Sequence, residues 1–67
     1  MKDRNEVELK VGDLVDCWPD ANSLCQHEFT GTVRSFRPDS DGSPLASVAD
    51  GDDDVYDFES HELEKVG

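Results

Sequence analysis

The amino-acid sequence predicts an all-β protein, a small antiparallel barrel of about five strands with a short 3₁₀ turn near the C-terminus. Three observations predict this fold class. Apolar and polar residues alternate with the period of two that a half-buried strand requires, above all in "EFTGTVRSFR". Clusters of Gly, Pro, Asp and Ser separate these runs. The chain has 67 residues, enough for one domain around one small core.

The first predicted strand follows a polar N-terminal segment. Residues 1–10 are expected to be flexible, and only Val7 and Leu9 in this segment are suited to begin an edge pairing. The barrel domain is expected to span residues 11–67. A strand over residues 14–18 opens the domain and ends before a proline, which cannot donate to a β-ladder.

The clearest strand is predicted over residues 28–37, after a loop that follows the first strand. Regular alternation places Val33 and Ser35 on one face of this strand and Phe36 on the other. Gly31 is expected to mark a bend, because glycine inside a strand often accompanies one.

The remaining elements are separated by turn formers, among which an Asp-Gly pair between apolar runs predicts a hairpin. In chain order they are a loop at 38–44, a strand at 45–49, the hairpin turn at 50–54, a strand at 55–58, a 3₁₀ turn at 60–63 and a closing strand at 64–66. The side chains expected to fill the core include Val15, Val33, Val48 and Leu63.

The charge of the chain argues against several functions. Seventeen acidic and 6 basic residues give a net charge of -11, which repels phosphate backbones and anionic lipid headgroups. We therefore expect no direct nucleic-acid binding and no membrane association. From Pro38 to Glu64 the chain has ten acidic residues and no Lys or Arg, so one side is expected to be strongly negative. A solvated, solubilising face is the alternative interpretation.

The two cysteines and the lack of an apolar leader or membrane-length run favour a cytoplasmic protein. In that compartment Cys17 is expected to be a core residue with a reduced thiol, although a disulfide to Cys25 stays open. A monomer is expected.

Metal and catalytic sites are not expected. Asp50, Asp52 and Asp54 fit the first ligand positions of an EF-hand loop. However, the glycine and the final glutamate that such a loop needs are replaced by Val55 and His61. The four candidates for zinc ligands match no finger-like spacing: Cys17, Cys25, His27 and His61. No Cys and His pair has a predicted pocket, so the sequence predicts no enzyme and no cofactor.

Three segments resemble the Tudor and KOW branch of SH3-like barrels over residues 11–66. "VGDLVDCWPD" is similar to the family's opening strand, "FTGTVRSF" to its second strand, and "VADGDDDVYDFESHEL" to its hairpin and final turn. The Tudor resemblance implies capture of methylated Lys or Arg in an aromatic cage, with Trp18 and Phe29 on two cage positions. The hairpin positions for the other cage aromatics hold Ala49 and Asp52. KOW modules bind RNA through basic loops, which this acidic chain lacks.

These observations favour a non-catalytic interaction module that binds a basic protein or peptide. An acidic rim would steer the partner, and its members are Asp52, Asp53, Asp54, Asp57 and Glu59. Aromatic anchors would set specificity, and the candidates are Trp18, Phe29 and Tyr56. The alternatives are an acidic mimic that occupies the groove of a nucleic-acid-binding protein, or a small structural domain whose aromatics only fill the barrel.

Overall fold

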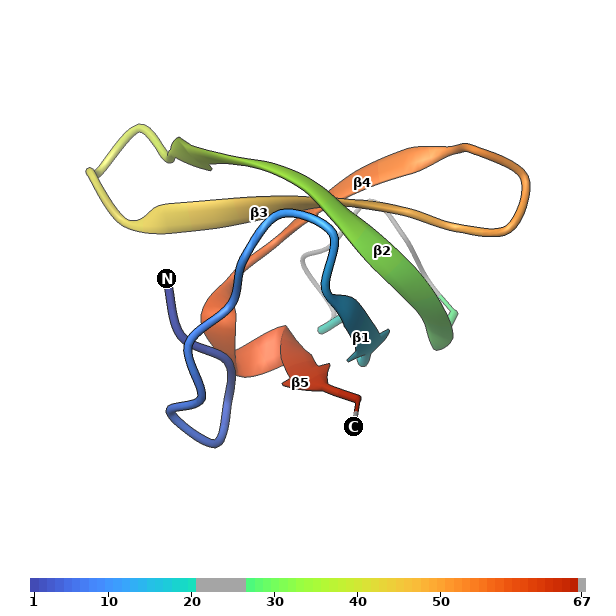
Figure 1. The fold of residues 1–67 in the computed structure, drawn as a ribbon. Coiled ribbons are helices and arrows are strands. Elements are labelled where there is room, and N and C mark those ends of the chain that lie inside the picture. Colours follow the sequence, from blue (N-terminus) through green and yellow to red (C-terminus); the bar gives the residue numbers. More distant parts are fainter. Residues whose placement is uncertain (21–26, 67) are drawn as a thin grey trace.

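The chain forms a single antiparallel β-sheet in the computed structural model (Figure 1), which describes residues 1–20 and 27–66. The strands are β1 (Leu14–Cys17), β2 (Phe29–Pro38), β3 (Pro44–Ala49), β4 (Val55–Phe58) and β5 (Leu63–Lys65). A 3₁₀ turn, η1 (Ser60–Glu62), joins β4 to β5. The sheet order is β4-β3-β2-β1-β5, and the predicted all-β class is confirmed.

Strand β2 links the two halves of the sheet. Its first residues pair with β1, from Phe29 to Thr32, and its later residues pair with β3. Figure 1 shows β2 curving from the β3 side down to β1. At Gly31 a Cβ atom would lie 2.4 Å from the carbonyl oxygen of Ala49, so only glycine fits this close approach. No helix in the described part of the chain has the length and apolar character needed to cross a membrane.

A β-bulge in β2 overturns part of the predicted alternation. The register with β3 shifts between Val33 and Ser35, so regular alternation stops there. Phe36 consequently pairs with Ala46 and packs against the core, whereas Ser35 is exposed. The prediction had placed Ser35 on the face of Val33 and Phe36 on the opposite face.

The connection between β2 and β3 is shorter than predicted. Pro38 and Pro44, both assigned to a loop at 38–44, face each other as the last pair of the two strands. Proline can take such a place because it lies at a strand end, where no further ladder bond is needed. The turn itself is confined to residues 39–43, while the hairpin turn at 50–54 lies where it was predicted.

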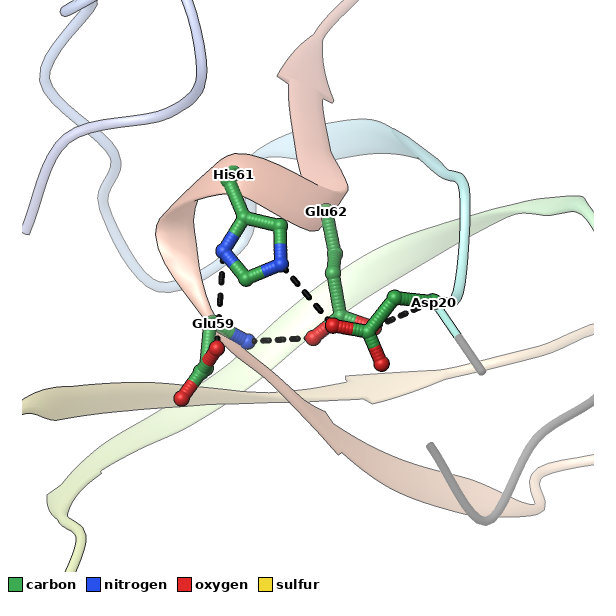
Figure 2. Close-up of side chains that lie close together, drawn as sticks. All are labelled: Asp20, Glu59, His61 and Glu62. Atoms are coloured by element: carbon green, nitrogen blue, oxygen red, sulfur yellow. Dashed lines mark hydrogen bonds and ion pairs between the residues drawn. The ribbon is translucent and has the colours of Figure 1, made fainter. Parts of the chain in front are cut away.

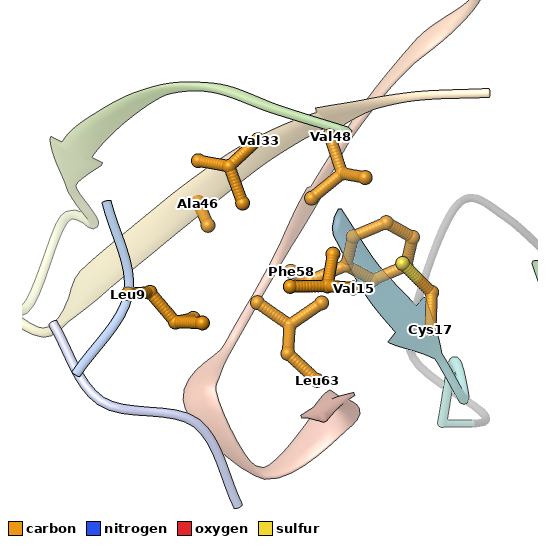
Figure 3. Close-up of a cluster of buried hydrophobic side chains, with 8 residues drawn as sticks. All are labelled: Leu9, Val15, Cys17, Val33, Ala46, Val48, Phe58 and Leu63. Atoms are coloured by element: carbon orange, nitrogen blue, oxygen red, sulfur yellow. The ribbon is translucent and has the colours of Figure 1, made fainter. Parts of the chain in front are cut away.

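The predicted core is confirmed, and the structure adds members to it (Figure 3). Val15, Val33, Val48 and Leu63 are all 0% exposed. The other buried members of the cluster are Leu9, Cys17, Ala46 and Phe58. Burying one such large apolar side chain contributes about 1.5–3 kcal/mol. Cys25 lies outside the described residues, and so does the predicted alternative of a disulfide to Cys17.

The N-terminal segment, which was expected to be flexible, has defined contacts along the outer edge of β5. Leu9 is buried in the core at 3% exposure. The N–H of Arg4 donates to the carbonyl of Leu63 over 2.9 Å, and the N–H of Lys65 donates to the carboxylate of Asp3 over 2.8 Å. The segment therefore covers a strand edge that would otherwise present unpaired backbone groups.

Candidate functional site

A shallow groove lies at the end of the β1–β2 pair. It has a volume of about 260 Å³ and is lined by Asp16, Cys17, Trp18, Glu28, Phe29 and Thr30. Trp18 and Phe29, two of the three predicted aromatic anchors, are thus brought together. Both side chains are half-buried, so each has a surface that a partner can reach.

The antiparallel register explains which side chains meet in the groove. Asp16 pairs with Thr30, and Cys17 pairs with Phe29. Because directly opposed residues point to the same face of a sheet, Asp16 and Thr30 lie on the outer face. The Thr30 hydroxyl donates to the Asp16 carboxylate over 2.5 Å. Trp18 follows Asp16 by two residues, so the alternation of an extended chain places it on the same outer side.

Phe29 connects the groove to the core through ring contacts. Its ring centroid lies 5.9 Å from that of Tyr56, 5.7 Å from that of Phe58 and 5.6 Å from that of His27. Phe58 is fully buried and belongs to the core cluster. Tyr56 is half-buried and reaches the groove through Phe29, not as a lining residue.

Acidic groups on the groove walls were missed by the sequence analysis. Asp16 and Glu28 are lining residues, and no Lys or Arg is among the lining residues that the structure describes. The hollow therefore combines an indole ring with two carboxylates. In the sequence both are isolated acids far from the acidic run, and only the strand register could have indicated that they meet.

The predicted acidic rim is divided in the structure and partly neutralised. Asp53 forms an ion pair with Arg34 over 3.1 Å. Asp57 pairs with Arg37 and also accepts a hydrogen bond from the Ser47 hydroxyl. Both arginines belong to β2, so the cations missing from the acidic segment come from a neighbouring part of the sheet. Of the hairpin aspartates, Asp52 and Asp54 are exposed at the tip and take part in no ion pair among the described residues.

The last rim residue, Glu59, belongs to a separate cluster at η1 (Figure 2). The His61 ring lies 3.0 Å from a carboxylate oxygen of Asp20 and 3.4 Å from one of Glu59. The hydrogen bond to Asp20 raises the pKa of His61; partial desolvation opposes this shift, and the charges of Glu62, Glu59 and Asp20 add to it. Through these two contacts His61 ties the segment after β1 to the end of β4.

Metal binding was considered for this cluster, because one ligand atom from each of its four residues lies within 4.8 Å of the others. Both oxygens of the buried Glu62 accept backbone N–H groups, from Asp20 over 3.0 Å and from Glu59 over 2.9 Å. The arrangement is that of a hydrogen-bonded cluster around His61, whose ring supplies a cation when it is protonated. The other zinc candidates that the structure describes, Cys17 and His27, are not part of it.

Comparisons of the chain with protein-family models, with curated proteins and with solved structures found no match. The Tudor and KOW resemblance therefore stays a prediction from the motifs. What the groove can bind follows from its own side chains, an aromatic ring beside two carboxylates, and this chemistry favours a cation.

Proposed function

We propose that the protein is a non-catalytic interaction module, of the SH3-like and Tudor-like kind, that binds a basic protein or peptide at the β1–β2 groove. One observation carries the proposal: Trp18 and two acidic residues, Asp16 and Glu28, line the same hollow. An aromatic face attracts a cation through its quadrupole, and a nearby carboxylate attracts the same charge. We place this module in the cytoplasm as a monomer.

The size of the groove favours one side chain of a larger partner. Sites for small molecules usually enclose about 300–1,000 Å³ and bury most of the ligand. The groove measures about 260 Å³ and lies at the end of the β1–β2 pair. A Lys or Arg side chain projecting from an extended peptide fits such a hollow, with the rest of the peptide lying across the sheet.

The exposed hairpin aspartates have a different role in this proposal. Asp52 and Asp54 lie at the tip of the β3–β4 hairpin, which the groove lining does not include. Together with the net charge of -11, they raise the rate at which a basic partner approaches. The groove then sets how long the partner stays bound.

The alternative of an acidic mimic of nucleic acid is less well supported. Mimicry requires carboxylates spaced over one continuous face. The pairing of Asp53 with Arg34 and of Asp57 with Arg37 interrupts such a face on the β3–β4 side. A local hollow with an aromatic wall fits a peptide-binding module better.

The test is to titrate the protein with short oligolysine and oligoarginine peptides while following the fluorescence of Trp18, the single tryptophan. The double variant D16N/E28Q is expected to bind about two- to thirtyfold more weakly, because each exposed ion pair contributes about 0.2–1 kcal/mol. The control D39N/D41N removes the same charge from the β2–β3 turn and should change affinity less. Equal losses in both variants would mean that only net charge matters, and the groove would not be the site.

A further inference from the structure

Two exposed apolar side chains lie side by side on the outer face of the β1–β5 pair. Leu14 is 46% exposed and Val66 is 39% exposed, although both are large apolar residues. The N–H of Val66 donates to the carbonyl of Leu14 over 2.9 Å, and this contact continues the register in which Asp16 pairs with Glu64. Because opposed residues point to the same face of a sheet, Leu14 and Val66 form one apolar patch, the Leu14/Val66 patch.

The Leu14/Val66 patch lies on the same face of β1 as residues of the groove. Leu14 precedes Asp16 by two residues, so both side chains point to the outer face, and Asp16 lines the groove. Leu14 pairs with Thr32 of β2, so the same row continues onto β2. Trp18, another lining residue, follows Leu14 by four residues. At about 3.3 Å per residue, this separation is about 13 Å along an extended chain.

The charges beside the patch decide what can cover it. Asp16 and Glu64 form the next row of the same face and are both half-buried. The N-terminal segment borders this row on the β5 side, where the side-chain amide of Asn5 donates to the Glu64 carboxylate over 2.7 Å. In the same segment, the guanidinium carbon of Arg4 lies 4.8 Å from the centroid of the Trp18 ring. The part of the face that stays open therefore lies over β1 and β2.

A second copy of the chain is a poor match for this face. Face-to-face packing would bring the carboxylates of Asp16 and Glu64 close to those of the other copy, and two chains of net charge -11 repel each other. A partner with a positive side chain and an apolar side chain complements both the acidic row and the patch.

We propose that the partner is an extended peptide that places a basic side chain in the groove and an aliphatic side chain, four residues away, on the Leu14/Val66 patch. This inference rests on the proposed function of the groove. Side chains four residues apart in an extended chain point to the same side, and their separation of about 13 Å equals that from Trp18 to Leu14. The groove then selects a positive charge, and the patch selects an apolar residue at a fixed distance from it.

The test compares three peptides of equal charge, each with two arginines followed by four residues. The first peptide has three serines and then a leucine, the second has four serines, and the third has the leucine directly after the arginines, where it points away from the sheet. The first should bind about three- to tenfold more tightly than the other two, because part of the leucine surface leaves water. Each peptide is also made in reverse order, because the spacing is the same in both chain directions. Trp18 fluorescence measures binding.

Variants of the protein show whether the leucine contacts the Leu14/Val66 patch. L14S should remove most of the preference for the first peptide and V66S part of it, while both keep their affinity for the serine peptide. The matched control is V55S, which removes a valine of 54% exposure from β4, at the opposite edge of the sheet. This variant should keep the preference.

Three results would overturn the inference. One is equal affinity of the unchanged protein for the leucine and serine peptides, a comparison that does not depend on how the variants fold. Another is a preference that survives in both L14S and V66S, and the third is a dimer in sedimentation experiments that L14S dissociates, since a second copy would then cover the patch. Absence of binding by all the peptides would instead overturn the proposed function, and the inference with it.

Discussion

Two segments far apart in the chain, residues 3–7 and 50–54, form the same turn. In both, the N–H of the first residue donates to the carbonyl of the fifth over 2.9 Å. The first residue is an aspartate, Asp3 or Asp50, whose Oδ1 atom accepts two backbone N–H groups further along the turn. In both, the fourth residue has left-handed backbone with a φ of 63°: Glu6 and Asp53.

The two turns differ in what the second oxygen of the first aspartate contacts. In Asp3 this oxygen accepts the N–H of Lys65 over 2.8 Å, and the residue is 4% exposed. Among the described residues, the hydrogen bonds of the Asp50 side chain stay within its own turn, and the residues after it are exposed. One local motif therefore joins two chain segments in the first case and ends a hairpin in the second. The density of acidic residues alone does not distinguish these roles.

The largest expected effect separates the two aspartates directly. D3A should lower the free energy of unfolding by about 1–3 kcal/mol, because it leaves three partly buried N–H groups without their acceptor and detaches the segment from β5. D50A should lower it by less, because water can reach the N–H groups of the exposed turn. Urea unfolding of both variants measures the difference. Equal losses would show that the contact with Lys65 adds nothing.

The same comparison predicts a pH dependence. Burial would raise the pKa of Asp3, but hydrogen bonds from the backbone of Lys65, Val7 and Asn5 and the charge of Lys65 lower it below 3.8. Because the pKa of Asp3 is lower in the folded state than in the unfolded state, its carboxylate stabilises the fold at pH values above the unfolded-state pKa. This contribution is lost as the pH falls through the folded-state pKa. On acidification, D3N should not show the loss of stability that protonation of Asp3 causes, whereas D50N should still show it. Acid unfolding of both variants measures the difference.

A smaller effect is expected at the left-handed positions of the turns. A third turn, residues 39–43, has glycine there: Gly42 has a φ of +89°. G42A should cost about 1–2 kcal/mol, because a Cβ is unfavourable in this conformation. E6G should stabilise the fold by up to about 1 kcal/mol for the same reason. Thermal unfolding measures both, and G51A is the control, since Gly51 has no left-handed backbone and open space around it.

The smallest effect is expected at the tip of the second turn. The triple variant D52N/D53N/D54N should change stability by no more than about 0.5 kcal/mol, because the loss of one exposed ion pair with Arg34 is offset by relief of like-charge repulsion. Association with a basic peptide should slow and depend less on salt, with little change in dissociation. A fall of many degrees in melting temperature would show that these aspartates hold the structure together, and the steering role would have to be abandoned.

The fold class, the strand positions and most of the core could be predicted because they depend on residues near one another in the chain. The period of two in β2 and the turn formers around β3 are local signals. Regular alternation failed at Phe36, because a bulge changes the register and only the partner strand shows where it lies. Leu9 was likewise assigned to a polar segment because no neighbouring residue indicates its place in the core.

The candidate site depends more strongly on tertiary structure. The sequence by itself indicated Trp18, as an aromatic residue at a strand end, and indicated Phe29 through the Tudor resemblance. That Asp16 and Glu28 join them in one groove depends on the pairing of β1 with β2.

That Arg4 lies on Trp18, and that the rim aspartates are paired with arginines of β2, likewise required contacts between distant segments. Local propensity and periodicity therefore determined which segments are strands and turns. The distribution of charge around the groove was decided by strand register and chain packing, because electrostatic attraction depends on distance in space and not on separation along the chain.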